Sequence, residues 1–80
     1  MEYAISTESG TSVETKRTEY FNGLKTWEEV IVFLTNKLDQ WCFRIHIFKY
    51  SSNHRLLGEK CVTMGNLVEV AKSKNDKILI

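Results

Sequence analysis

The chain has 80 residues, a formal net charge of +1 and 42% apolar residues. This length fits a single small domain, residues 1–80, with one hydrophobic core. The near-neutral charge excludes a strong electrostatic field directed at DNA or at an anionic membrane. The apolar content excludes intrinsic disorder, and the longest apolar run, residues 30–34, is far shorter than the ~20 residues of a membrane-spanning helix.

The N-terminus and the cysteines indicate the compartment. Residues 1–6 lack the basic start and the apolar stretch of a secretory signal. The chain has 2 cysteines, Cys42 and Cys61, whereas small disulfide scaffolds carry about 6 to 8. We therefore expect a cytoplasmic protein whose thiols are reduced.

Two strands are predicted at the start of the chain. Residues 2–7 alternate in polarity, with Tyr3 and Ile5 on the same face, and residues 8–11 have turn chemistry. Residues 13–20 are rich in threonine but nearly bare of apolar side chains. That composition suits an edge strand, which its charges protect from pairing with other chains.

The best-defined predicted element is a helix over residues 27–39. Thr26 and Glu29 have the spacing of a capping box at its start. Large apolar side chains then recur at intervals of three and four and form one stripe: Trp27, Val30, Ile31, Leu34, Leu38 and Trp41. Because Val32 and Phe33 lie off this stripe, the helix is either flanked on two sides or exposes apolar surface.

Residues 41–50 change to a period of two, which indicates a strand. Its two faces are predicted to carry different side chains: Trp41, Phe43, Ile45 and Ile47 under the helix, and Cys42, Arg44, His46, Phe48 and Tyr50 on the opposite side. Residues 51–54 resemble a turn, and residues 55–64 are predicted to return as the second strand of a hairpin, with Gly58 as a bulge.

The last part of the chain leaves one alternative open. Asn66 and Glu69 repeat the cap-and-acid spacing, which favours a short helix over residues 67–74, while the valines there keep a strand as the alternative. Residues 77–80 are expected to pair as a final strand. The predicted order is ββαββαβ, an α+β two-layer sandwich with helices on one face of a mainly antiparallel sheet.

Metal and disulfide chemistry are not expected. Four potential zinc ligands fall within residues 42–61, namely Cys42, His46, His54 and Cys61. Residues four apart on a strand are separated by ~13 Å, so Cys42 and His46 cannot bind one zinc ion. A disulfide would depend on the register of the hairpin, because a two-residue turn pairs Cys42 with Cys61 and a four-residue loop pairs it with Thr63. We expect neither metal nor cofactor.

Catalytic signals are weak. The sequence has no glycine-rich phosphate loop and no Cys-x-x-Cys motif. The side chains that could assemble an RNA-cleaving site of the small-toxin type are Arg44, His46, Tyr50, His54 and Arg55, with imidazole as the base and guanidinium on phosphate. Histidines on exposed strand faces are usually ordinary surface residues. The prediction is a non-enzymatic protein, with an RNase-type toxin as the lesser alternative.

The candidate binding site lies on the strand face away from the helix. It comprises Arg44, His46, Phe48 and Tyr50, with Arg55 beside them. Aromatic residues with arginine and few carboxylates are typical of protein interface cores. We predict an inhibitor, adaptor or regulator, of a build common in phages and mobile elements, that binds another protein through this face. The alternative is single-stranded RNA or DNA binding by the same residues; a second copy of the chain is a further candidate partner, and a membrane is not.

Overall fold

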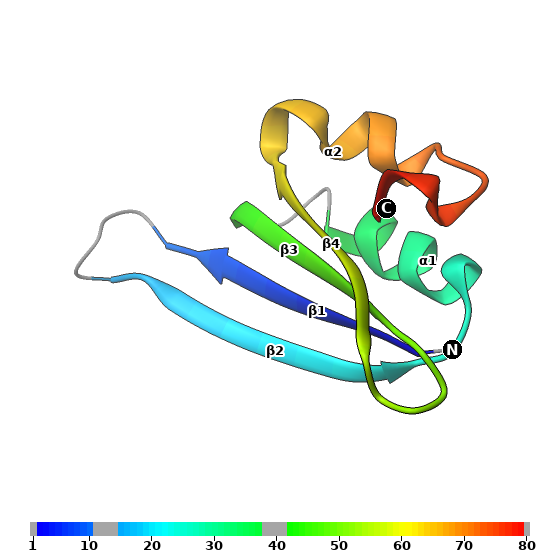
Figure 1. The fold of residues 1–80 in the computed structure, drawn as a ribbon. Helices are drawn as coiled ribbons and strands as arrows, with labels where there is room; N and C mark the ends of the chain where they lie inside the picture. Colours follow the sequence, from blue (N-terminus) through cyan, green and yellow to red (C-terminus); the bar gives the residue numbers. More distant parts are fainter. Residues whose placement is uncertain (1, 11–14, 38–41, 80) are drawn as a thin grey trace.

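The computed structural model describes residues 2–10, 15–37 and 42–79. Four strands form one antiparallel sheet in the order β2-β1-β3-β4, namely β1 (Glu2–Ser9), β2 (Arg17–Leu24), β3 (Cys42–Tyr50) and β4 (Leu56–Thr63). The helical elements are α1 (Trp27–Lys37), α2 (Met64–Ala71) and the 3-10 helix η1 (Asp76–Leu79). All three lie on the same face of the sheet (Figure 1). The predicted α+β two-layer arrangement is confirmed.

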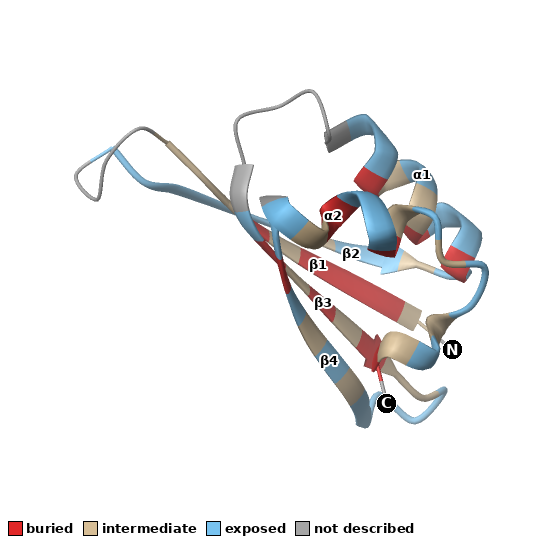
Figure 2. Ribbon diagram, turned by 90° about the horizontal axis from the view of Figure 1, so that it is seen from above, coloured by how far each residue is buried: buried red, intermediate tan, exposed pale blue. Residues whose placement is uncertain are grey.

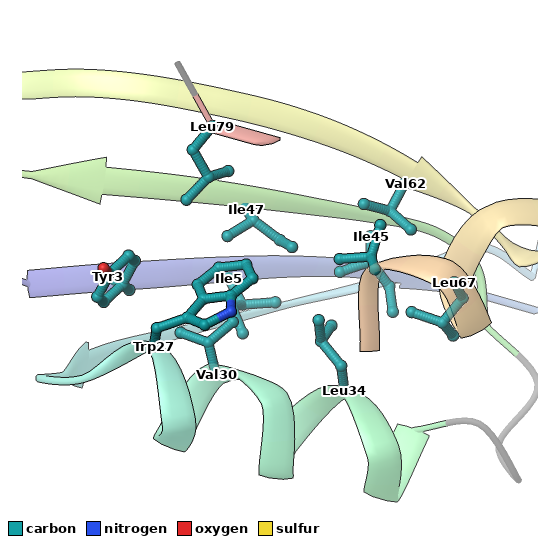
Figure 3. Packing of buried hydrophobic residues seen from close by; sticks show 11 residues of the cluster. Tyr3, Ile5, Trp27, Val30, Leu34, Ile45, Ile47, Val62, Leu67 and Leu79 are labelled. Atoms are coloured by element: carbon teal, nitrogen blue, oxygen red, sulfur yellow. The ribbon is translucent and has the colours of Figure 1, made fainter. Parts of the chain in front are cut away.

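The core lies between these two layers. Its buried apolar side chains come from both layers: Tyr3, Ile5, Trp27, Val30, Leu34, Ile45, Ile47, Val62, Leu67, Val70 and Leu79. Figure 3 shows Trp27, Val30 and Leu34 of α1 pointing at Ile5 and Ile47 in the sheet. The core forms because the period of two in the strands and the three-and-four spacing of α1 each turn one apolar face inward.

Helix α1 begins where the sequence predicts, with a small change in its cap. The Thr26 hydroxyl accepts a hydrogen bond from the Glu29 N–H at 3.2 Å. The Glu29 carboxylate accepts from the N–H of Lys25 at 2.7 Å, one residue before the donor that a capping box uses. The predicted residues Leu38 and Trp41, and the side chain of Phe43, lie outside the described part of the chain.

The two apolar residues off the α1 stripe have different surroundings. The Phe33 ring packs on Phe21 of β2, with ring centroids 4.7 Å apart, so a second side of the helix is flanked. Val32 is 61% exposed. The helix therefore has a second packed side and also leaves apolar surface open.

Strand β2 lies at the sheet edge, as expected, but further along the chain than predicted. It spans Arg17–Leu24 rather than residues 13–20, of which residues 13 and 14 lie outside the described ranges. The strand continues past Phe21 because that ring finds Phe33 to pack on. An extra residue is accommodated between Phe21 and Leu24, where Gly23 has a φ of +80° that glycine adopts without strain.

The second helix is α2, which decides between the two alternatives for this segment. It starts earlier than predicted, with Thr63 as its N-cap, and Asn66 Oδ1 accepts from the Thr63 N–H at 2.9 Å. Asn66 is thus inside the first turn rather than the cap. The helix is favoured because its spacing buries both Leu67 and Val70.

The predicted final strand over residues 77–80 is wrong for residues 77–79, and Ile80 lies outside the described ranges. Asp76–Leu79 form η1, which lies across the helix-side face of the sheet. Two contacts hold it there: Leu79 is buried in the core, and the Asp76 carboxylate binds Lys49 of β3 at 2.7 Å. A strand at the sheet edge would have left the Lys49 ammonium without this partner.

The β3–β4 hairpin has a longer loop than predicted. The Ser51 N–H donates to the Arg55 carbonyl at 2.8 Å, and Tyr50 pairs with Leu56. The register shifts between Lys49 and Tyr50, so the bulge falls at Leu57, next to Gly58. In this register Cys61 pairs with His46, four positions from Cys42, or ~13 Å along the strand, which excludes a Cys42–Cys61 disulfide.

Candidate functional site

Strand β3 presents alternate side chains to the two faces of the sheet. Ile45 and Ile47 are buried beneath the helices, and Arg44, His46, Phe48 and Tyr50 therefore lie on the opposite face. Figure 2 shows this alternation as buried and less buried bands along β3. Within the described ranges, no helix or loop covers this second face, which we call the open face (Figure 1).

The aromatic side chains of β3 form a row on the open face. The rings of His46 and Phe48 are stacked, with centroids 4.4 Å apart and an interplanar angle of 23°. The rings of Phe48 and Tyr50 follow at 6.4 Å and 31°. Because each ring lies against the next, the row is held in one arrangement, and all three side chains are partly exposed.

Tyr20 of β2 extends this row across the sheet. Its side chain is hydrogen-bonded to that of Tyr50, and burial, this bond and the nearby Glu59 carboxylate raise the pKa of Tyr50 above its ordinary value. Ala4, on the intervening strand and paired with Phe48, is only 2% exposed although it lies on the open face. Its burial follows from the rings over it. Tyr20, His46, Phe48 and Tyr50 are called the aromatic platform below.

Carboxylates flank the platform. Glu2 of β1 is the direct cross-strand partner of Tyr50, and Glu59 of β4 is the partner of Phe48. The Glu59 carboxylate lies 3.7 Å from His46 Nε2. At the other end of β3, Arg44 is paired with Glu8, whose carboxylate binds Lys16 at 3.3 Å. The open face therefore has an acidic side near Phe48 and a more basic end near Arg44.

Four of the five predicted site residues lie on this face, whereas Arg55 lies outside the strands. Arg55 lies in the hairpin loop, where its N–H donates to Ser51 Oγ at 3.2 Å, and it is exposed. The next residue, Leu56, pairs with Tyr50 and is 51% exposed beside the platform. The sequence pattern did not indicate Leu56 or Tyr20, because their place on the face depends on the bulges in β4 and β2.

The predicted set of histidines and cysteines is not brought together. His46 lies within β3, whereas His54 lies in the loop beyond the strand with a φ of +62°. Cys61 is a free, exposed thiol opposite His46. In the described ranges, no three His, Cys, Asp or Glu side chains converge as metal ligands would. The two histidines of the toxin-like alternative are therefore separated.

A second ionisable cluster is buried on the helix side of the sheet. The Lys49 ammonium is 7% exposed and lies 2.7 Å from Asp76 Oδ2, which also accepts a hydrogen bond from the Tyr3 hydroxyl. The bonds from Lys49 and Tyr3 lower the pKa of Asp76. Burial and the bond to Asp76 raise the pKa of Tyr3. Because all three groups satisfy one another within the core, this cluster holds η1 in place rather than presenting chemistry to solvent.

A shallow groove of about 500 Å³ lies on the helix layer. Trp27, Ile31 and Val32 of α1 line one wall, and Ala71 and Lys72 line the other. The Trp27 indole N–H already donates to the Ser73 carbonyl at 3.1 Å. The groove thus offers apolar contact but no buried polar group that awaits a ligand.

Comparisons with known proteins leave function to be argued from the geometry. No protein-family model matches the chain, and neither a curated protein nor a solved structure matches it. Within the described ranges, every helix is too short or too polar to cross a membrane. The open face is the surface feature from which a function can be inferred.

Proposed function

We propose that this chain is a small binding protein that docks another protein through the aromatic platform and Leu56. The observation that carries the proposal is the position of the platform on the sheet face opposite both helices. Adjoining, partly exposed apolar side chains on the surface of a small domain are typical of an interaction site. Interface cores are enriched in tyrosine, phenylalanine and arginine, the residue types gathered here.

The fixed arrangement of the rings suits them to act as an anchor. His46 is stacked on Phe48, the Tyr50 ring lies tilted beside Phe48, and Tyr50 is also hydrogen-bonded to Tyr20. Side chains that are already ordered lose little entropy on binding, so more of the contact energy is retained as affinity. An inhibitor, adaptor or regulator needs such an anchor and no catalytic group. A cytoplasmic setting agrees with the free, exposed thiol of Cys61.

Two features favour a protein ligand over single-stranded nucleic acid. Bases stack on open ring faces, but the faces of His46 and Phe48 are turned toward each other. Glu2 and Glu59 also flank the rings and would repel the phosphates of a bound strand. Nucleic-acid binding is therefore the alternative that the test must separate.

The test is capture from an extract of the source cells, with and without nuclease, followed by mass spectrometry. We expect one protein to be retained by the wild type and lost from Phe48→Ala/Tyr50→Ala. The matched control is Val32→Ala/Val68→Ala, which removes exposed apolar side chains from the helix layer and should retain the partner. Loss of a truncated hot-spot aromatic costs about 2 kcal/mol or more of binding free energy, roughly a 30-fold drop in affinity.

A milder variant guards against unfolding. Tyr20→Ala/Leu56→Ser changes two residues that are each more than half exposed, so its thermal midpoint should match that of the wild type. Retention of the partner by both open-face variants would contradict the proposal. Loss of the partner after nuclease treatment alone would instead support nucleic-acid binding.

A further inference from the structure

We infer that the platform receives a cationic side chain from its partner, an arginine above all, between the carboxylates of Glu2 and Glu59. This inference rests on the proposed function and adds the chemistry of the partner surface. The open face then recognises a basic segment of a protein rather than an apolar or acidic one.

The strand register places one glutamate on each side of the β3 rings. Glu2 is the partner of Tyr50 on one side, and Glu59 is the partner of Phe48 on the other. Neighbouring strands are ~4.8 Å apart, and Tyr50 and Phe48 are two residues apart along β3, so the backbone positions of the two glutamates are ~12 Å apart on a diagonal that crosses β3. A guanidinium held above β3 between them has a flexible glutamate side chain on each side.

Both carboxylates are available for such a contact. The ion pairs within the described ranges are Lys16–Glu8, Arg17–Glu19, His46–Glu59 and Lys49–Asp76. Glu2 is in none of them, and the Glu59–His46 separation of 3.7 Å is too long for a hydrogen bond. A cation placed here gains charge-assisted hydrogen bonds to the two carboxylates, and its aliphatic stem packs against the rings. Arginine fits better than lysine because its planar guanidinium has five N–H donors and can donate to a carboxylate on each side at once.

The other charge on β3, that of Arg44, determines how a partner segment would be oriented along the strand. Arg44 lies four residues from Phe48 along β3, or ~13 Å, which exceeds the screening length at physiological salt. It therefore does not cancel the acidic side of the platform. The partner segment should place its basic side chain near Tyr50 and present neutral or acidic groups toward Arg44.

The test is an NMR titration of the isotope-labelled full chain at low salt with three probes: a hexa-arginine peptide, a hexa-glutamate peptide and oligouridine. We expect the arginine peptide to shift the amides of Glu2, Phe48, Tyr50 and Glu59. Glu2→Gln/Glu59→Gln should weaken its binding by about tenfold, because two charge-assisted contacts to the arginines are lost. Glu28→Gln/Glu69→Gln makes the same change of net charge on the exposed helix layer and should leave the affinity unchanged.

The outcomes separate this inference from the proposed function. Equal weakening by both glutamine pairs would show that only net charge matters and would overturn the inference, as would oligouridine shifting the platform amides. In the capture experiment, a partner kept by Glu2→Gln/Glu59→Gln but lost from Phe48→Ala/Tyr50→Ala would sink the basic-partner inference and leave the docking face intact. A partner kept by both variants would remove the docking face itself.

Discussion

At the scale of single residues, Lys49 is a charged side chain that the fold buries. A buried ammonium is costly unless it is paired and hydrogen-bonded. Asp76 supplies the opposite charge at 2.7 Å, and the Tyr3 hydroxyl completes the bonding of the same carboxylate oxygen. The cluster joins the first strand, the third strand and η1, so it links the two ends of the chain.

Asp76→Asn should lower the free energy of unfolding by about 2–3 kcal/mol, because it leaves the Lys49 charge buried without a counter-ion. Chemical denaturation followed by circular dichroism measures this loss. Lys49→Met/Asp76→Asn is the matched control and should recover much of the stability, since no buried charge remains. A double variant as unstable as the single one would contradict this account.

The same carboxylate gives a pH signature. The pKa of Asp76 is lower in the folded chain than its unfolded value of about 3.9. Its contribution is therefore present above pH ~4 and is lost as the pH falls through the folded-state value. Wild-type stability should decrease through that acidic range more steeply than that of Asp76→Asn. Parallel curves for the two proteins would assign the acid sensitivity to other carboxylates.

The sequence predicted which face of the sheet each β3 residue occupies, but it did not predict the cluster of Lys49, Asp76 and Tyr3. The period of two was enough to place Phe48 and Tyr50 away from Ile45 and Ile47, because alternation is a local property of the strand. The same alternation puts Lys49 on the buried side. Its partner is 27 positions further along the chain, and no local pattern connects Lys49 with Asp76.

At the scale of elements, α2 is stabilised by packing more than by its own composition. Leu67 and Val70 anchor it, and Asn66 closes its first turn. Gly65 lies in that turn although glycine is unfavourable within a helix. A Cβ added there would meet only Thr63 Oγ1, at an ordinary 3.8 Å.

Gly65→Ala should therefore raise the free energy of unfolding by about 0.5–1 kcal/mol, since alanine loses less conformational entropy in a helix. Thermal unfolding of the full chain gives the shift. Gly23→Ala is the contrasting variant: its Cβ has open space, but its φ of +80° strains any other residue, so it should destabilise by about 1 kcal/mol. If both substitutions moved stability in the same direction, backbone conformation would not be the cause.

Elements whose apolar pattern is self-contained were predictable. The stripe of α1 and the alternation of β3 fix their type and nearly their bounds. The predicted bounds of β2 were too early in the chain. The strand extends through Phe21 and Leu24 because these side chains pack on Phe33 and on the core, which are tertiary contacts. Residues 77–79 have strand-like composition but adopt η1, since the contacts of Asp76 and Leu79 are tertiary.

At the scale of the whole molecule, the two faces of the sheet have different surroundings. The helix side of the sheet holds the core, and the open face holds the platform. The sequence predicted this division, because two amphipathic helices can cover only one face. It did not reveal that β1 would lie between β2 and β3, which places Glu2 beside Tyr50 and so creates the acidic side of the platform.

A one-sided core also limits the stability of the fold. A domain of this length retains only about 3–5 kcal/mol of net stability. Leu34 is fully buried where α1 faces the sheet, and truncating a buried leucine to alanine costs about 2.7–5 kcal/mol. We therefore expect Leu34→Ala to be largely unfolded at 25 °C, with the dispersion of its NMR amide signals lost. The control is Val32→Ala on the same helix. Because the Val32 side chain is 61% exposed, this change should alter the free energy of unfolding by less than about 0.5 kcal/mol. A cooperatively folded Leu34→Ala would mean that stabilising contacts exist beyond this single interlayer core. Such contacts would be sought first on the open face, where self-association of two chains would add a second core.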